Sequence, residues 1–348
     1  MRSADGRFAG AADRTHCRSR IRVGSRSFYA ASILLPAPVR EAAYALYAFC
    51  RFSDDLVDLG DGGQRAIAHL RHRLDQAYAG TPAGHPIDRA FADMILRFGM
   101  PRALPEALIE GLAWDVEGVR CDGITDLYAY AARVAGSVGA MMCVLMGIRD
   151  AAVVSRACNL GIAMQLTNIA RDVGEDARAG RLYLPRAWLR EAGQDPDAWL
   201  ADPKATPAVR ATVTRLIETA EGLYGASGAA IAHLPRRCRP AIFAARHLYR
   251  EIGLEVLNRE ADSVSDRARV PGSRKLALMA QAVKDAVTTA RRPLSGRGLP
   301  EAAFLVEAVR HAPPAAGPAI PPLGPFARRV LWVAELFAAL EARQRQPG

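Results

Sequence analysis

The residues best suited to chemistry lie in the stretch FCRFSDDLVD, residues 49–58. Because successive helix residues are about 100° apart, Arg51, Asp54 and Asp58 fall on one narrow face. The same face carries two tyrosines, Tyr44 and Tyr47. The opposite face is apolar, so the stretch predicts a packed helix that turns a row of carboxylates toward a partly buried space.

A second polar row lies in AMQLTNIARDVGEDARAGRLYLP, residues 163–185. Gln165, Asn168, Asp172 and Asp176 are spaced so that they share one helix face. The other positions of this helix are apolar enough to be buried. One such row is typical of a solvated surface, whereas two rows on helices with apolar faces favour a shared cleft.

Carboxylates crowded in a cleft repel one another and lose hydration, so cations must compensate them. Oxygen ligands without histidine or cysteine suit Mg²⁺, which combines few protein carboxylates with phosphate oxygens and water. Arginines beside the rows can donate paired hydrogen bonds to phosphate: Arg51, Arg171, Arg178 and Arg181. We therefore predict a cleft with an acidic row on two walls, which holds a diphosphate through bridging Mg²⁺. Mn²⁺ is the alternative ion.

The composition narrows the classes of function. The six cysteines form no CxxC pair and the seven histidines are scattered, which argues against a zinc site and favours free, buried thiols. The net charge of +10 comes almost entirely from arginine. No basic stretch is interleaved with aromatic residues, so no nucleic-acid partner is expected. Most arginines are expected on the solvated surface, and those beside the acidic rows are candidates for binding an anion.

Apolar residues recur with a helical period along most of the chain, and alternating strand patterns are nearly absent. The sequence therefore predicts an all-α protein with helices over residues 38–58, 64–79, 86–98, 104–119, 126–148, 151–177, 207–232, 237–257, 273–290, 301–311 and 326–344. Neither a signal peptide nor a transmembrane helix is expected. A cytoplasmic protein follows, with peripheral contact at the inner membrane face as an open alternative.

Three regions are expected along the chain. Residues 1–20 are polar and rich in arginine and predict a flexible segment. Residues 21–292 contain both acidic rows and no break in composition, so they predict one catalytic domain. Residues 293–348 predict a loop rich in proline followed by a final helix that packs on the domain or faces a membrane. The oligomeric state is not predicted.

The motifs resemble those of the squalene/phytoene synthase family, and within it those of the bacterial phytoene synthases. The two acidic stretches carry most of the resemblance, and GSRSFYAASILLP, VAGSVGAMM and ARHLYREIGLEV agree with it. The similarity covers about residues 22–290. A departure is Ala131, where many relatives have cysteine after the tyrosine that corresponds to Tyr130.

The resemblance implies an isoprenoid synthase fold: a single helical bundle around a central cavity. It also implies a Mg²⁺-dependent prenyltransferase of carotenoid biosynthesis that joins two geranylgeranyl diphosphates head to head, through prephytoene diphosphate, to phytoene. Prenyl diphosphates would be the substrates. No NADPH is expected, because phytoene forms without a reductant.

The resemblance further assigns roles to residues. The metal ligands would be Asp54, Asp58, Asn168, Asp172 and Asp176. Tyr47, Arg51 and Tyr183 would join the four aspartates in catalysis. Substrate binding would involve Ser25, Arg26, Ser27, Tyr44, Gln165, Asn168, Arg171, Arg181, Tyr249 and Arg267. Aromatic faces that could contact a carbocation are Tyr44, Tyr47, Phe28, Tyr130, Tyr183 and Tyr249.

Several alternatives stay open at this point. Ser25 and Ser27 could cap a helix, Tyr44 could be core packing, and the small residues of 134–139 could serve helix packing or leave room for prenyl chains. A squalene or hydroxysqualene synthase acting on farnesyl diphosphate would share these motifs. DDLVD also fits a prenyl elongase or a terpene cyclase. A relative that binds without catalysis is the alternative from a different class.

Overall fold

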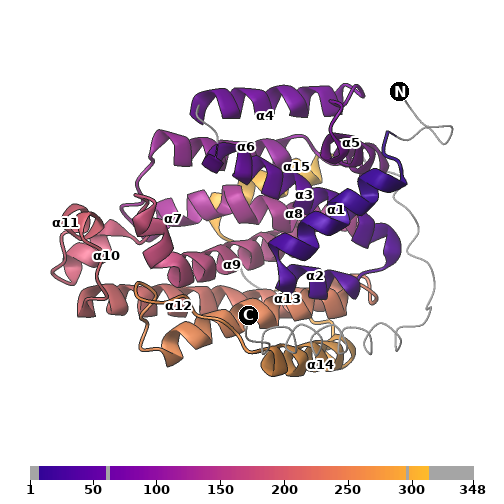
Figure 1. Cartoon of the computed structure of the whole chain (residues 1–348). Helices are drawn as coiled ribbons and strands as arrows, with labels where there is room; N and C mark the ends of the chain where they lie inside the picture. The colour runs from indigo at the N-terminus through magenta and orange to yellow at the C-terminus, as the bar shows by residue number, and fades with distance from the viewer. Residues whose placement is uncertain (1–7, 60–62, 295–297, 313–348) are drawn as a thin grey trace, which may run out of the picture.

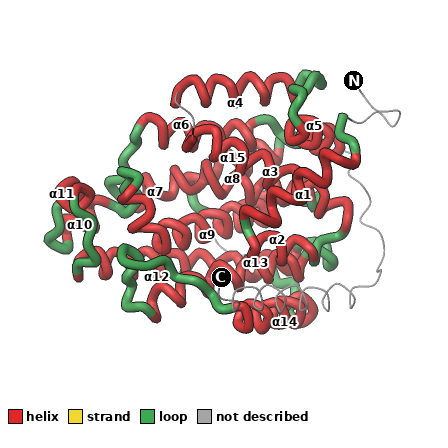
Figure 2. Tube along the Cα trace, viewed as in Figure 1, coloured by secondary structure: helices red, strands yellow, loops and turns green. Residues whose placement is uncertain are grey.

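The computed structural model describes residues 8–59, 63–294 and 298–312, and this part of the chain contains helices and no strand (Figures 1 and 2). The all-α prediction is confirmed. The α-helices are α1 (Ala11–Gly24), α2 (Arg26–Ile33), α3 (Ala37–Leu59), α4 (Gly63–Tyr78), α5 (Pro86–Phe98), α6 (Ala103–Glu117), α7 (Ile124–Ala131), α8 (Ser137–Leu145), α9 (Ala151–Arg178), α10 (Arg186–Glu191), α11 (Pro196–Ala201), α12 (Pro207–Gly228), α13 (Arg239–Asn258), α14 (Gly272–Thr288) and α15 (Ala303–Arg310).

The long helix α9 is the centre of the bundle, with α8 on one side and α12 and α13 on the other (Figure 1). Asp150 caps its first turn, because the carboxylate accepts a hydrogen bond from the backbone N–H of Val153 at 3.0 Å. Apolar residues along α9 are buried, among them Ile162, Leu166 and Ile169. Neighbouring helices cover most of α9, so the half-buried polar residues on one of its faces border a partly enclosed space.

Outer layers cover this centre. Helices α4, α5 and α6 form the top of Figure 1, α3 lies below them beside α1, and α14 covers α13 at the bottom. A stacked pair, Phe49 on α3 and Phe91 on α5, has its ring centroids 3.9 Å apart and joins the upper layers. The helix that carries the first acidic row is therefore fixed by its apolar face, as the sequence predicts.

A π-helical turn, η1 (Ala132–Gly136), joins α7 to α8 within one continuous helix. This helix, Ile124–Leu145, has 22 residues and is long and apolar enough to cross a membrane, although no transmembrane helix was expected. Because 56% of its apolar window is buried inside the bundle, core packing accounts for its composition. The sequence placed this helix at 126–148, close to these bounds.

The N-terminal segment differs from the prediction. Residues 1–20 were expected to be flexible, whereas residues 11–24 form α1. Only Cys17 and Ile21 on α1 are buried apolar residues, so its helical period is weak in the sequence. Asp13 holds α1 in place through a paired ion bridge to Arg89 of α5, with contacts of 2.6 and 3.0 Å. This long-range bridge leaves no local sequence pattern.

Three other short helices, α2, α10 and α11, were also not predicted as separate elements. Helix 207–232 ends in a 3-10 turn, η2 (Ala229–His233), and helix 301–311 begins with another, η3 (Pro300–Ala302). The loop and final helix expected over residues 313–344 lie outside the described residues. All six cysteines are free, and five of them are buried, as expected from their spacing.

Candidate active site

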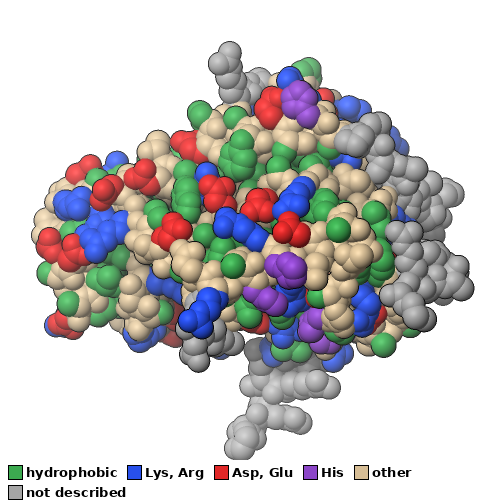
Figure 3. Space-filling model, turned by 90° about the horizontal axis from the view of Figure 1, so that it is seen from above, with side chains coloured by type: hydrophobic (Ala, Val, Ile, Leu, Met, Phe, Trp, Pro, Cys, Tyr) green, Lys and Arg blue, Asp and Glu red, His purple; other side chains and the backbone are tan. Residues whose placement is uncertain are grey.

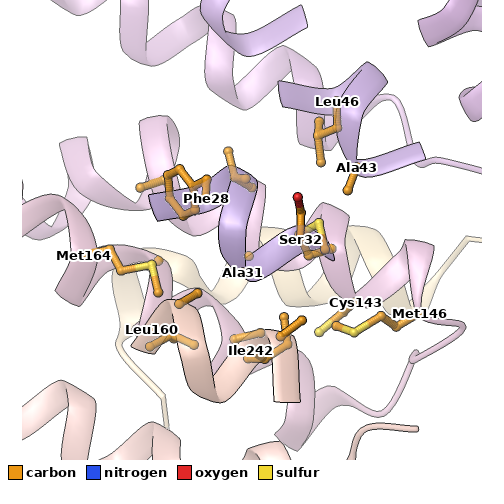
Figure 4. Close-up of a pocket in the computed structure, with 18 of the residues that line it drawn as sticks. Phe28, Ala31, Ser32, Ala43, Leu46, Cys143, Met146, Leu160, Met164 and Ile242 are labelled. Atoms are coloured by element: carbon orange, nitrogen blue, oxygen red, sulfur yellow. The ribbon is translucent and has the colours of Figure 1, made fainter. Parts of the chain in front are cut away.

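An apolar cavity of about 310 Å³ lies between α2, α3, α8, α9 and α13 (Figure 4). Figure 4 shows side chains of carbon and sulfur pointing into it, with the hydroxyl of Ser32 as the visible oxygen. Representative lining residues are Phe28, Leu46, Met142, Leu160 and Ile242. Such a lining excludes water and suits a hydrocarbon.

Two glycines let the helices beside this cavity approach closely. A Cβ on Gly161 would lie 2.3 Å from the carbonyl oxygen of Ala135, and one on Gly139 would lie 2.3 Å from that of Ala157. Residues 134, 135, 138 and 139 also line the cavity. The segment of small residues therefore serves both uses that the sequence left open, tight packing and cavity wall.

The first acidic row lies on α3 near one end of the cavity. Arg51 donates to Asp54 at 3.1 Å and forms an ion pair with Asp55 at 2.8 Å. The Asp54 and Asp58 side chains are 43% and 38% exposed, so both are accessible to a ligand. Asp55 is less exposed and is also bound by Arg20 of α1. The outer aspartates of the motif are thus accessible, and the middle one is held by two arginines.

The second row lies on α9, and arginines surround its central carboxylate. Arg171 donates to both oxygens of Asp172, at 2.6 and 2.5 Å, and Arg267 donates to the same two oxygens, at 2.8 and 3.1 Å. Arg267 also lies 3.4 Å from Glu175. Arg178, by contrast, donates to the carbonyl of Val264, away from the carboxylates.

Gly174 explains how Arg267 reaches this row. A Cβ at this position would lie 2.3 Å from the carbonyl oxygen of Val264, so only glycine lets the loop of residues 259–271 lie against α9. The backbone N–H of Gly174 donates to the carbonyl of Ser263 at 2.9 Å. This contact places Arg267 beside Asp172.

The two rows face one cleft. Arg181, which follows α9, donates to Asp58 of α3 at 2.5 Å and so bridges the two walls. Asp115 of α6, which the sequence analysis missed, accepts hydrogen bonds from Tyr130 at 2.9 Å and from Tyr183 at 2.7 Å. The rings of the two tyrosines stack with centroids 5.2 Å apart.

The pKa values of three carboxyl groups report the crowding. Burial, then the charge of Asp58, raises the pKa of Asp54 to about 6. Burial, then the charge of Asp172, raises the pKa of Asp176 to about 7. Burial also raises the pKa of Asp115, against the opposing effect of its two tyrosine hydrogen bonds. The charge of Asp115 acts on both Asp54 and Asp176, so these groups surround one space.

Aromatic residues lie where this space meets the cavity. Phe28 contacts Tyr249 with ring centroids 4.9 Å apart, and Tyr47 with centroids 6.4 Å apart. Tyr47, Gln165 and Asn168 line the cavity itself. The Oδ1 atom of Asn168 is buried and accepts no hydrogen bond within the described residues. An unpartnered oxygen at this position is available to a ligand.

Four residues predicted for substrate binding have other surroundings. Tyr44 is 5% exposed, stacks on Tyr29 and does not line the cavity, as in the packing alternative. Ser25 caps α2 by accepting from the N–H of Phe28 at 3.2 Å. Arg26 is exposed, and Ser27 is half-buried on α2. Burial, and then the charge of Arg26, lower the pKa of Lys275 on α14.

The donor set fits Mg²⁺ better than a metal held by protein ligands alone. Within residues 8–59, 63–294 and 298–312, no three His, Cys, Asp or Glu side chains converge on one point. Each wall instead offers carboxylate oxygens, and α9 adds the unpartnered amide oxygen of Asn168. Because Mg²⁺ takes few protein ligands and completes its shell with phosphate oxygens and water, this arrangement suits it once a diphosphate is bound.

Residues 21–275 match the sequence profile of the squalene/phytoene synthases. The chain is 50% identical over 307 residues to the phytoene synthase of Rhodobacter capsulatus, covering 86% of this chain and 91% of that one. It is 47% identical over 349 aligned positions to the phytoene synthase of Cereibacter sphaeroides, covering 96% and 95%. These similarities and the acidic cleft agree with the resemblance found in the motifs.

The fold is similar to solved structures of the same group. A dehydrosqualene synthase in complex with a ligand superposes with a TM-score of 0.73 at 33% identity, covering 78% of this chain and 96% of that one. A squalene synthase from Alicyclobacillus acidocaldarius gives a TM-score of 0.66 at 26% identity, covering 72% and 94%. The isoprenoid synthase fold implied by the motifs is confirmed.

Proposed function

The chain belongs to the squalene/phytoene synthase family, and we propose that it is a phytoene synthase that condenses two geranylgeranyl diphosphates head to head. The observation that carries the proposal is a hydrocarbon cavity that meets two facing rows of carboxylates and arginines. The cavity suits the prenyl chains, and the charged end suits the diphosphates. The runner-up, a squalene-type enzyme, would use the same arrangement with farnesyl diphosphate.

The charged residues would bind and orient the leaving group. Asp54 and Asp58 on one wall, and Asn168, Asp172 and Asp176 on the other, would hold Mg²⁺. The ion, when bound, neutralises the diphosphate and makes it a better leaving group. Arg51, Arg171, Arg181 and Arg267 would donate to its oxygens, and all four must exchange present carboxylate partners for phosphate to do so.

The aromatic residues would protect the carbocation that ionisation leaves behind. Phe28, Tyr47 and Tyr249 present their rings between the charged end and the cavity, where cation–π contact and exclusion of water stabilise an allylic cation. Tyr183 lies in the loop after α9, and its hydrogen bond to Asp115 would hold that loop over the cleft.

Product mass tests the proposal. We expect purified protein given geranylgeranyl diphosphate and Mg²⁺ to form a C40 hydrocarbon whether or not NADPH is present, and chelation by EDTA to stop turnover. A C30 product from farnesyl diphosphate, with no C40 product from the longer substrate, would assign the squalene-type function instead.

Asp54→Ala tests the metal assignment. The change removes one of two accessible carboxylates on its wall, so we expect turnover to fall by at least a hundredfold, which corresponds to about 2.7 kcal/mol. Circular dichroism should report an unchanged helical fold. Asp202→Ala, at a side chain that is 69% exposed, is the matched control and should keep full activity. Equal Mg²⁺-dependent rates in both variants would reject the assignment.

A further inference from the structure

A cluster of arginines lies at the end of the molecule where α13 begins. We define the basic cluster as Arg236, Arg239, Arg291 and Arg292. The side chain of Arg291 donates to Nδ1 of His233 at 3.1 Å, and Nε2 of that histidine then donates to the carbonyl of Arg292 at 2.7 Å. Arg239 donates to the carbonyl of Leu234 at 3.0 Å. These contacts hold the two chain segments together.

The basic cluster is short of counter-charge. Within the described part of the chain, Arg236, Arg239, Arg291 and Arg292 form no ion pair with a carboxylate. Burial, and then the charges of Arg236 and Arg291, lower the pKa of Arg239. Arg236, Arg291 and Arg292 are exposed to solvent. An uncompensated group of this kind attracts anions.

The α4 side of the molecule differs from the basic cluster in how its arginines are paired. Figure 3 views this side, and red and blue side chains lie next to each other on it. Arg71 bonds Glu106 at 2.9 Å, and Arg102 bonds Asp75. Figure 1 places α4 at the top of the molecule and α14 at the bottom. Several arginines on the α4 side are therefore paired with carboxylates, unlike those of the basic cluster.

The cluster also adjoins the wall of the cavity. The inner faces of η2 and of the first turns of α13 line the cavity with Ile231, Leu234, Ala241, Ile242 and Ala245. Tyr249, further along α13, marks the charged end of the site, and Arg239 precedes it by ten residues, or about 15 Å of helix. The cluster thus lies beside the end of the cavity that is remote from the acidic rows.

We propose that the basic cluster is a docking surface for an anionic lipid bilayer, which brings the apolar end of the cavity to the membrane. The inference rests on the proposed function in that a C40 hydrocarbon is insoluble in water and must pass into lipid. Val287 lies just before the cluster and is 82% exposed, so it offers an apolar contact to the bilayer.

Vesicle flotation of the full chain, without substrate, tests the proposal. We expect binding to vesicles of phosphatidylcholine and phosphatidylglycerol in equal parts, weakened by salt, and little binding to phosphatidylcholine alone. The triple variant Arg236→Gln, Arg291→Gln, Arg292→Gln should bind at least tenfold more weakly. The matched control is Arg65→Gln, Arg71→Gln, Arg102→Gln, which removes the same charge from the α4 side and should bind as the wild type does.

Four outcomes would overturn the proposal. The first is wild-type binding that does not distinguish the two vesicles. The second and third are an equal loss in both triple variants and no loss in the first variant. The fourth is displacement from vesicles by inorganic pyrophosphate at constant ionic strength, which would indicate a small-anion site. Turnover in detergent should be the same in both variants, which shows that they fold. Because binding is measured without substrate, its failure is distinguishable from failure of the proposed synthase activity.

Discussion

Replacing Asp176 by asparagine should stabilise the protein and inactivate it. Its carboxylate makes no side-chain hydrogen bond in the described structure, while burial and the charge of Asp172 raise its pKa to about 7. An ordinary aspartate titrates near about 3.9, so the ionised form is disfavoured by about three pKa units in the fold. Asparagine has nearly the same shape and carries no charge, so it removes this cost.

The magnitude follows from the pKa of Asp176. Three units correspond to about 4 kcal/mol, and solvent screening of a half-buried side chain reduces this to about 1–2 kcal/mol. The sign follows from linkage: the folded state holds this proton more tightly, so the cost is complete above about pH 7 and shrinks as the pH falls toward about 4. For a chain of this size, the gain corresponds to a rise in Tm of about 2–4 °C at pH 8.

Differential scanning calorimetry of the metal-free protein measures this rise in Tm. Asp176→Asn should melt above the wild type at about pH 8, and the difference should diminish at about pH 5. Mg²⁺ with pyrophosphate should raise the Tm of the wild type more than that of the variant, because the proposed ligand is gone. Asp202→Asn, at a well-exposed position, is the control and should change little. The reasoning would be refuted if the variant were less stable than the wild type at about pH 8, or if the difference in Tm between them were the same at about pH 5 and about pH 8.

Two further predictions concern how the cleft is held. Asp115→Asn removes the anionic acceptor of both tyrosine hydroxyls and leaves one of them facing an amide NH2 group, so stability should fall by about 1–3 kcal/mol and proteolysis within residues 179–185 should accelerate. An effect simply additive with Tyr183→Phe would contradict the shared hydrogen bond. Gly174→Ala forces the Val264 carbonyl away from α9, so turnover should fall about tenfold or more as Arg267 withdraws. Gly222→Ala, where a Cβ meets nothing within 4 Å, is its control and should be neutral or slightly stabilising; equal turnover in these two variants would contradict the steric argument.

The main helices and the acidic rows could be predicted because both follow the local period of a helix. Helix 86–98 coincides with α5, where Pro86 starts the helix and Gly99, with a φ of 57°, ends it. Burial on one face and polar residues on the other were equally visible in α3 and α9. A local period also predicts which residues share a face, so the members of each acidic row could be predicted.

The missed features depend on contacts between distant segments. Asp115 is one of four acidic residues in α6, and nothing local relates it to Tyr130 or Tyr183. Arg267 reaches Asp172 only because Gly174 admits a loop from ninety residues away. The one available signal was a glycine inside a strong helix, which costs stability unless something packs against it. Tyr44 was ambiguous because a tyrosine on a polar stripe can equally well turn into the core.

The π-helical turn η1 sets the rotation between the two halves of the helix that contains it. A π turn accommodates one residue more than an α-helical turn, and each residue rotates a helix by about 100°. Tyr130, before the turn, reaches Asp115, while Val138 and Met142, after it, line the cavity. Deleting one residue from 132–136 would restore a regular helix and rotate Tyr130 away from its partner relative to the residues that line the cavity after the turn. Changes in length here, more than changes in side chain, would uncouple the ionic end of the site from the apolar end.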